Sequence, residues 1–316
     1  MFKTLSRWLQ GASLPTAPLM LRRLTQNPII RSEMLPGEDG ANINGPSLIR
    51  VPAWASPLGR YYLYFAHHHG SYIRLAFANH LEGPWLIHRP GTLHLADVPA
   101  CRGHIASPDV HVDQQRREIR MYFHGPAVKE EGQRSFVAVS KDGLQFSASD
   151  EVLGSFYLRA VPWAGQWIAM AKGGIMYRSP DGLTKFEQLP FPAFPMKDPK
   201  ANRPGSVRHV ALHLTGSTLF VYYTKIGDAP ESILRSRIDL NDDPATWRAC
   251  NAEMLAWPEA PYEGANLPVR CSKKGVAKGR ENALRDPAIF VEGDGLYLVY
   301  AVAGESGLAL AELIAK

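Results

Sequence analysis

The chain has 316 residues and a formal net charge of +5, with 45% hydrophobic and 21% charged residues, the proportions of a globular protein with a sizeable core. Its basic residues are scattered instead of forming a stripe, which excludes a typical nucleic-acid-binding protein. No run of 18 apolar residues occurs, so we expect no membrane span. Three unevenly spaced cysteines exclude a disulfide framework or a cysteine zinc site.

The N-terminal segment, residues 1–14, is compatible with a short amphipathic helix outside the main fold. Ser6, Arg7 and Gln10 interrupt its apolar residues, which argues against a secretory signal peptide. We therefore expect a cytoplasmic protein with unpaired cysteines. The sequence gives no indication of its oligomeric state.

A short theme then returns five times along the chain. Three copies place a proline beside polar residues and before an apolar tail, at 44–51, 107–112 and 285–291. Two copies, at 157–161 and 208–212, keep the apolar tail without the proline. An aromatic-rich apolar run follows each copy, at 61–68, 119–125, 167–173, 219–227 and 296–304. Repeats of about 40–50 residues built from short strands are typical of radial arrays.

This spacing predicts an all-β fold, a five-bladed β-propeller with four antiparallel strands in each blade, as a single domain over 1–316. The blades are expected at 44–95, 104–150, 155–190, 206–258 and 284–316. The last blade lacks a fourth strand, so we expect a strand from within 19–31 to complete it and close the ring. A long insertion at 251–283 precedes the fifth blade, and long loops on rigid scaffolds often carry function.

Polar residues of all five repeats are expected at one mouth of the central channel. In a propeller the first strand of each blade lines the channel and the second runs antiparallel to it. The start of every first strand and the end of every second strand therefore lie on the same face. Charged and imidazole residues concentrate at these positions, which predicts a polar ligand site. The substrate-binding candidates are Asn44, His67, His68, His104, His124, Arg159, Lys172, Arg208, Lys225, Arg285 and Glu305.

Several of the candidate residues also have a structural interpretation. Adjacent residues on a strand point to opposite faces, so the three histidines at 67–69 cannot all bind one zinc ion. Asp109 would fix the turn before its strand, and Asp286 would pair with Arg285. Glu263, in the insertion, would either reach over the mouth or be solvated.

Two motifs carry a resemblance to the five-bladed propellers of glycoside hydrolase family 43 and its relatives in families 32, 68, 117 and 130. Ser107-Pro108-Asp109-Val110 is similar to the Ala-Pro-Asp-Val motif of family 43, whose aspartate orients and tunes the catalytic acid. Arg285-Asp286-Pro287 resembles the Arg-Asp-Pro motif of family 32, whose aspartate supports the transition state. The resemblance implies a glycosidase with a small carbohydrate ligand and no required cofactor, and it allows a structural metal ion in the channel.

The chain departs from family 43 at both the base and the acid. That family has an aspartate base at the start of the first blade, where this chain has Asn44, and an acidic glutamate on the third blade, which residues 156–160 lack. The remaining catalytic candidates are Asp109, His209, Glu263 and Asp286.

We expect inverting hydrolysis from these four groups, with an acid and a base flanking the bond. Asp286 or Asp109 would activate water, and Glu263 or His209 would protonate the leaving oxygen. His209 is aligned with Asp286 in the expected repeat, and a histidine is thought to replace a carboxyl group in family 117.

Two other functions stay open. Asn44 in place of a base favours a carbohydrate-binding propeller without catalysis. Clustered cations near a channel need carboxylates or an anionic ligand, which favours an anionic sugar or a phosphorylase similar to family 130. These cations are Arg159, Lys172, Arg208 and Arg285.

Overall fold

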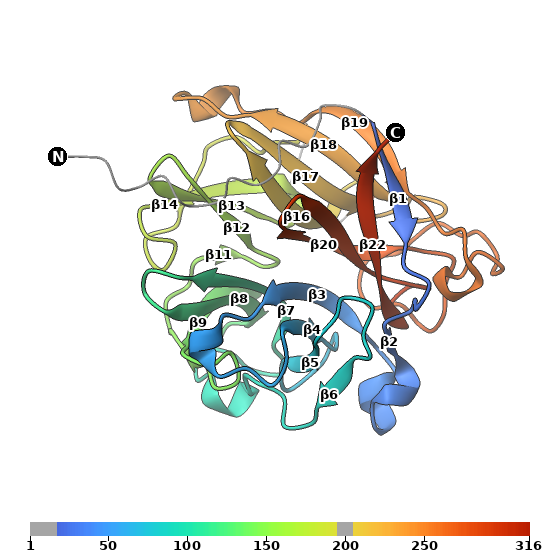
Figure 1. The fold of residues 1–316 in the computed structure, drawn as a ribbon. Coiled ribbons are helices and arrows are strands. Elements are labelled where there is room, and N and C mark those ends of the chain that lie inside the picture. Colours follow the sequence, from blue (N-terminus) through green and yellow to red (C-terminus); the bar gives the residue numbers. More distant parts are fainter. Residues whose placement is uncertain (1–17, 195–204) are drawn as a thin grey trace.

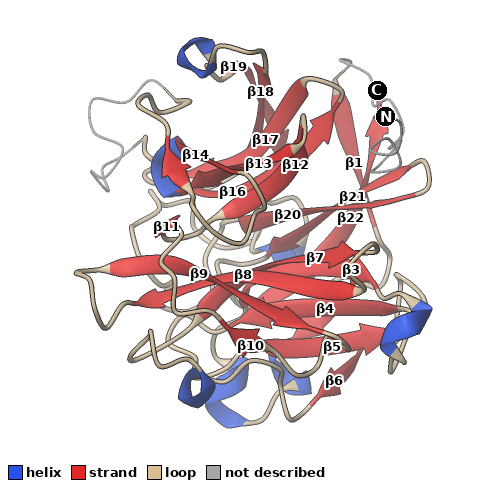
Figure 2. Ribbon diagram, turned by 90° about the vertical axis from the view of Figure 1, so that its left-hand side faces the viewer, coloured by secondary structure: helices blue, strands red, loops and turns tan. Residues whose placement is uncertain are grey.

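The structure is a computed structural model that describes residues 18–194 and 205–316. Its strands form five antiparallel sheets arranged as blades around a common axis, so the predicted all-β five-bladed propeller is confirmed (Figures 1 and 2). The helix expected at 1–14 lies outside the described residues. Helices of the described part are short 3-10 turns, and none of them is long and apolar enough to cross a membrane.

Four blades are built from consecutive strands, running from the axis to the rim. The first holds β3 (Asn44–Arg50), β4 (Tyr61–Ala66), β5 (Arg74–Ala78) and β6 (Leu86–His88). The second holds β7 (Ala106–Asp113), β8 (Glu118–Pro126), β9 (Gln133–Ser140) and β10 (Ser147–Ala148), and β11 (Gly154–Ser155) also pairs with β9. The third holds β12 (Arg159–Trp163), β13 (Gln166–Ala171), β14 (Ile175–Ser179) and β15 (Glu187–Gln188). The fourth holds β16 (Val207–Thr215), β17 (Thr218–Lys225), β18 (Ile233–Asp239) and β19 (Cys250–Ala256).

The fifth blade combines strands from both ends of the described chain. Its inner strands are β20 (Arg285–Glu292), β21 (Gly295–Ala301) and β22 (Gly307–Ala315). β1 (Leu19–Arg23) pairs antiparallel with β22 along its whole length, and β2 (Ile30–Arg31) pairs with the start of β22. Figure 1 shows β1 in blue beside β22 in dark red. The predicted closure by a strand from 19–31 is confirmed.

The aromatic-rich runs form the second strands of the blades. All six residues of β4 (Tyr-Tyr-Leu-Tyr-Phe-Ala) are buried. Both faces of each blade are covered by its neighbours, so these strands read as continuous apolar runs instead of alternating ones. Tyr222 and Tyr300, for example, belong to one cluster between the fourth and fifth blades, and neither is exposed.

The proline theme marks a β-bulge near the start of a first strand. In β3, β7 and β20 the pairing with the second strand skips two residues: 45–46, 107–108 and 286–287. The first residue of each pair has a positive φ (56°, 51° and 47°), and the second is proline. Proline is tolerated there because the bulge removes its nitrogen from the ladder.

β16 has the same skip, at residues 208–209. The ladder therefore places Arg208 level with Asp286, and His209 level with Pro287. The expected alignment of His209 with Asp286 is wrong by one residue, because the copy without a proline gave no fixed point for the register.

Candidate functional site

Side chains at the fourth position of the first strands join neighbouring blades. Ser47 Oγ accepts a hydrogen bond from the backbone N–H of Val110 (2.9 Å), and Asp109 Oδ2 accepts one from Ala160 N–H (3.0 Å). His111 Nε2 lies 3.0 Å from the same oxygen. Burial raises the pKa of Asp109, but His111 lowers it further, so the net shift is downward. Asp109 is thus engaged in holding the second and third blades together, and this geometry favours its structural interpretation.

Arg159 continues these links without any carboxylate. Its Nη1 donates to the carbonyl oxygens of Ser107 (3.0 Å) and Pro108 (2.8 Å), and its Nε donates to Val210 O (3.3 Å). The side chain is buried and joins the second, third and fourth blades. Backbone carbonyls therefore replace the anionic partner that the sequence led us to expect for Arg159.

Arg285 and Arg208 belong to a buried network of ion pairs. Arg285 contacts Glu231 (2.9 Å), Glu305 (3.2 Å) and Glu281 (2.8 Å), and Arg208 Nε lies 2.8 Å from the other oxygen of Glu231. Glu231 is not exposed at all. The charges of both arginines are balanced inside the protein, and Glu305 is already engaged by Arg285.

The start of the first blade offers no proton-accepting group. Asn44 Nδ2 donates to Asn42 Oδ1 (2.9 Å) and weakly to Glu305 Oε2 (3.4 Å). The next residue, Gly45, has a positive φ, and a Cβ there would lie 2.9 Å from Ser107 Cα. This close approach explains the glycine at position 45, next to the asparagine that stands where a base was expected.

The loop between β19 and β20 covers part of the mouth. Residues 251–256 of the expected insertion belong to β19, so the loop itself starts at Trp257. Arg208 donates to the carbonyl oxygens of Lys273 and Gly275, and Ala277 N–H points to Glu305 (3.4 Å). These bonds fix the loop to the rim of the fourth and fifth blades.

Glu263, in the same loop, does not lie at the mouth. Its Oε1 contacts Arg23 Nε and the Tyr300 hydroxyl, both at 2.8 Å, and its Oε2 accepts the backbone N–H groups of Glu259 and Ala260. The side chain has no exposed surface. This corrects the catalytic assignment of Glu263: the carboxylate holds the loop against β1 and β21.

We expect Glu263→Gln to lower the free energy of unfolding by about 2 kcal/mol, because it removes the charge that Arg23 contacts in a buried site. Catalytic constants should stay unchanged. Urea unfolding followed by fluorescence measures this. Glu259→Gln is the matched control, since Glu259 contacts the same arginine but its side chain is 49% exposed. A larger loss in the control would contradict the assignment.

Asp286 and His209 form a buried pair at the mouth. Asp286 Oδ1 contacts His209 Nδ1, and Oδ2 accepts the Gly45 N–H (3.2 Å), so Asp286 also links the fifth blade to the first. Burial raises the pKa of Asp286, but His209 and Arg285 bring it well below its usual range. Burial lowers the pKa of His209 more than Asp286 raises it. The pair is therefore a carboxylate beside a neutral imidazole, whose Nε2 is the nitrogen available to a ligand.

His209 lines a narrow cavity together with other imidazoles and one phenol. The ring centroids of Tyr157 and His209 are 4.0 Å apart, those of Tyr157 and His124 4.4 Å, and those of His104 and His124 6.4 Å. Two buried atoms in its lining, Asn44 Oδ1 and His124 Nδ1, have no partner. The complete lining is Asn44, His68, His104, Ala106, Ser107, His124, Gln133, Tyr157 and His209. The cavity has a volume of about 10 Å³, enough for a single water molecule, so it can accept one uncharged hydroxyl group of a ligand.

Burial lowers the pKa of the cavity histidines, that of His124 well below its usual value and those of His68 and His104 to a smaller extent. The unfolded chain, with ordinary imidazoles, then binds more protons between the folded pKa values and pH 6.5. Stability that is complete above pH 6.5 is therefore lost as the pH falls, by about 1.4 kcal/mol per pH unit for each such imidazole.

Urea unfolding between pH 7.5 and 5.0 measures this loss. We expect His124→Gln to reduce the slope by up to one proton. An unchanged slope in this variant would show that His124 does not stay neutral in the folded protein.

Two predicted mouth residues, His67 and Lys225, line neither this cavity nor the adjoining groove. His67 Nδ1 accepts the backbone N–H of His69 (3.0 Å), and burial lowers its pKa. Lys225 Nζ lies 5.8 Å from the centre of the Tyr223 ring. Neither residue is therefore placed in the site by the structure.

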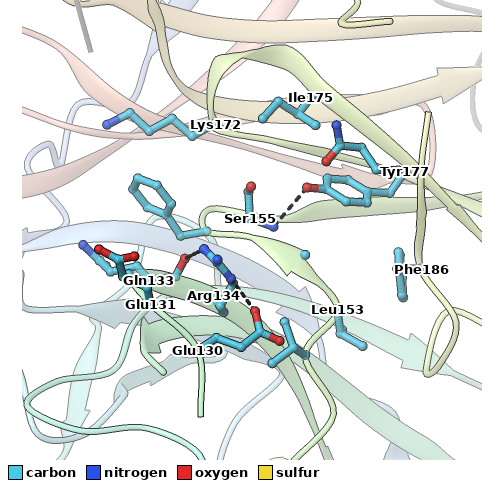
Figure 3. Close-up of a pocket in the computed structure, with 15 residues that line it drawn as sticks. Glu130, Glu131, Gln133, Arg134, Leu153, Ser155, Lys172, Ile175, Tyr177 and Phe186 are labelled. Carbon is cyan, nitrogen blue, oxygen red and sulfur yellow. Dashed lines mark hydrogen bonds and ion pairs between the residues drawn. The ribbon is translucent and has the colours of Figure 1, made fainter. Parts of the chain in front are cut away.

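A groove of about 830 Å³ runs between the second and third blades and meets the cavity at Gln133, which lines both (Figure 3). Figure 3 shows Lys172 on one wall and Glu130 and Arg134, an ion pair of 2.8 Å, on the other. Its volume is in the range of small-ligand sites. The complete lining is Glu130, Glu131, Gly132, Gln133, Arg134, Val152, Leu153, Gly154, Ser155, Phe156, Lys172, Ile175, Tyr177, Phe186 and Gln188.

No protein-family model matches the chain. An uncharacterized protein of Acanthamoeba polyphaga mimivirus is 36% identical to it over 338 residues, which cover 96% of this chain and 93% of the viral protein. The chain belongs to the family of this mimivirus protein.

Solved structures with the same fold resemble this member of the mimivirus protein family only distantly in sequence. The GH43_1 enzyme from Xanthomonas citri has a TM-score of 0.59 and 14% identity, over 87% of this chain and 89% of that chain. The α-L-arabinofuranosidase from Lactobacillus brevis has a TM-score of 0.60 and 11% identity, over 90% and 92%. The predicted resemblance to the propellers of glycoside hydrolase family 43 is thus confirmed for the fold.

Sequence reasoning missed the aromatic residues that this member of the mimivirus protein family places between cavity and groove. Phe156 and Tyr157 lie side by side, with ring centroids 4.9 Å apart. Tyr157 begins the degenerate third copy of the repeat and Phe156 precedes it, at the place where family 43 has its glutamate. Two consecutive aromatic residues just before β12, the first strand of the third blade, were the available signal. Among the described residues, no group of three or more His, Cys, Asp or Glu side chains is arranged to hold a metal ion.

Proposed function

We propose that the protein is a carbohydrate-active enzyme that cleaves glycosidic bonds, with His209 as its acid–base group and Asp286 as the residue that orients it. The buried Asp286–His209 pair at the edge of the cavity carries this proposal. A carboxylate on Nδ1 fixes the imidazole tautomer and leaves Nε2 to exchange protons. The shared fold supports a sugar ligand, because solved family 43 structures include a β-xylosidase/α-arabinofuranosidase in complex with xylotriose.

In hydrolysis, His209 Nε2 takes a proton from a water molecule whose oxygen attacks the anomeric carbon. The bond to the leaving oxygen breaks, and that oxygen receives a proton from solvent or from His209. Because Asp286 and His209 contact each other, they cannot stand as separate acid and base on opposite sides of the bond, as two-carboxylate mechanisms require. Asp286 and His209 are thus not the separate base and acid of the expected mechanism, and we propose that they act as a single acid–base pair.

Phosphorolysis is the second candidate, and one observation favours it. The buried carboxylates Glu231 and Glu305 are engaged by arginines, so no second carboxylic acid of the described mouth is available. Phosphate is already an anionic nucleophile and needs no base to activate it.

Aryl xylosides and arabinofuranosides, xylo-oligosaccharides and arabino-oligosaccharides, each with and without inorganic phosphate, test both candidates. Turnover without phosphate supports hydrolysis, and turnover that requires phosphate supports phosphorolysis. Sugar binding without turnover on the whole panel would replace both with a carbohydrate-binding propeller.

A further inference from the structure

Lys172 differs from the other cations of the mouth. Arg208 and Arg285 pair with buried glutamates, and Arg159 with carbonyl oxygens. Lys172 forms no ion pair with a carboxylate of the described residues, and the charged groups that act on it are the cations Arg208 and Lys274. A partly buried cation whose charged neighbours in the described part of the chain are cations lowers its free energy when an anion binds beside it.

The position of Lys172 connects the groove with the cavity. It lines the groove, and its Nζ lies 5.0 Å from the centre of the Phe156 ring and 5.8 Å from that of Tyr157. Tyr157 in turn packs against His209. A group bound at Lys172 is therefore separated from the acid–base pair by the Tyr157 ring.

The aromatic residues and the neutral cavity define what else the ligand must carry. Phe156, Tyr177 and Phe186 line the groove, and their rings offer apolar surface to the C–H faces of a sugar. The neutral cavity histidines suit one hydroxyl group of the ligand. Lys172 is left as the cation that faces a bound ligand.

We propose that Lys172 is a specificity residue that binds an oxyanion, carried as a carboxylate, sulfate or phosphate substituent on the glycan in the groove. The inference rests on the proposed carbohydrate site. Free inorganic phosphate would supply the same chemistry, and the two sources are separated by experiment.

Binding is measured on an array of neutral oligosaccharides and their uronate-, sulfate- and phosphate-bearing counterparts, and with inorganic phosphate in solution. We expect the protein to prefer acidic members at least tenfold. Lys172→Met should abolish that preference and Lys172→Arg should retain it. Lys141→Met, which removes a lysine whose side chain is 72% exposed, is the control for net charge.

Dependence on pH gives a second readout that a structural role would not produce. Burial, together with Arg208 and Lys274, lowers the pKa of Lys172 to about 8. The cation is lost as the pH rises through that value, so affinity for acidic glycans should fall about tenfold per pH unit well above pH 8. In Lys172→Arg this decline should disappear, because the guanidinium stays charged.

Equal binding of neutral and acidic members, an unchanged preference in Lys172→Met, or no binding at all would overturn the inference. Lysine-dependent binding of phosphate alone, with no preference among glycans, would assign the site to a free phosphate. Binding is measured without turnover, so these outcomes are independent of the role of His209. Equal binding of neutral glycans would leave the proposed glycosidic cleavage intact.

Discussion

Replacing Asp286 by asparagine should lower kcat by about 10²- to 10⁴-fold on any substrate that the protein cleaves. Asparagine tolerates the positive φ of 47° at this position and still accepts the Gly45 N–H, so the fold should be retained. The amide, however, no longer stabilises a protonated His209. Because Asp286 raises the pKa of His209, the acid limb of the pH profile of kcat/KM should move to lower pH in this variant.

Steady-state kinetics with circular dichroism as a folding check measures both effects. Asp294→Asn is the matched control. Asp294 lies in the exposed turn at the opposite end of β20 from Asp286, so this variant removes the same charge away from the site and should leave kcat unchanged. Full activity of Asp286→Asn would remove the pair from the catalytic machinery. His209→Gln should be at least as severe, since it removes the proton-exchanging nitrogen itself.

Arg285→Met should be the most destabilising substitution among those considered, with the free energy of unfolding lowered by about 3–5 kcal/mol. The side chain is 1% exposed and contacts three glutamates. Without it, Glu231 keeps only Arg208 as an ionic partner, and Glu305 loses its arginine in a buried site. Uncompensated charge in the interior is the physical cause of the loss.

Urea denaturation measures this loss, with Arg22→Met as the matched control. Arg22 pairs with Glu312 at the surface, where its side chain is 64% exposed, so its removal should cost less than about 1 kcal/mol. A similar loss in both variants would show that the buried network contributes no more than a surface pair.

The fold could be predicted because its main signals are local. The aromatic-rich runs are buried on both faces, and Asp-Gly turns recur between strands; the Asp142 and Asp181 carboxylates both accept backbone N–H groups of their own turns. The prolines mark bulges at a fixed place in the first strands. Each of these features involves only a few consecutive residues, so the repeat can be recognised without knowledge of distant contacts.

The site was predicted less well because its chemistry depends on distant partners. The sequence predicted that His209 and Asp286 lie at the same mouth. It did not predict their direct contact, because the predicted alignment of the fourth blade with the fifth was wrong by one residue at the bulge. Glu263 has the residue type of an acid, yet its contacts with Arg23 and Tyr300 come from strands far away in sequence. In the sequence, Lys172 could not be distinguished from the other cations of the mouth. The difference is visible only in the structure, where the three arginines have partners.

The pairing of β1 with β22 has a consequence for synthesis on the ribosome. β1 is made before every other described strand, and its partner is made last. Its backbone groups, and the apolar side chain of Leu19, must therefore wait unpaired while nearly the whole propeller emerges. Completed blades can assemble in order during this time. However, the ring closes only when β22 is made and pairs with β1. Chains halted late in translation should therefore be cleaved by proteases at β1, although most of their blades are formed.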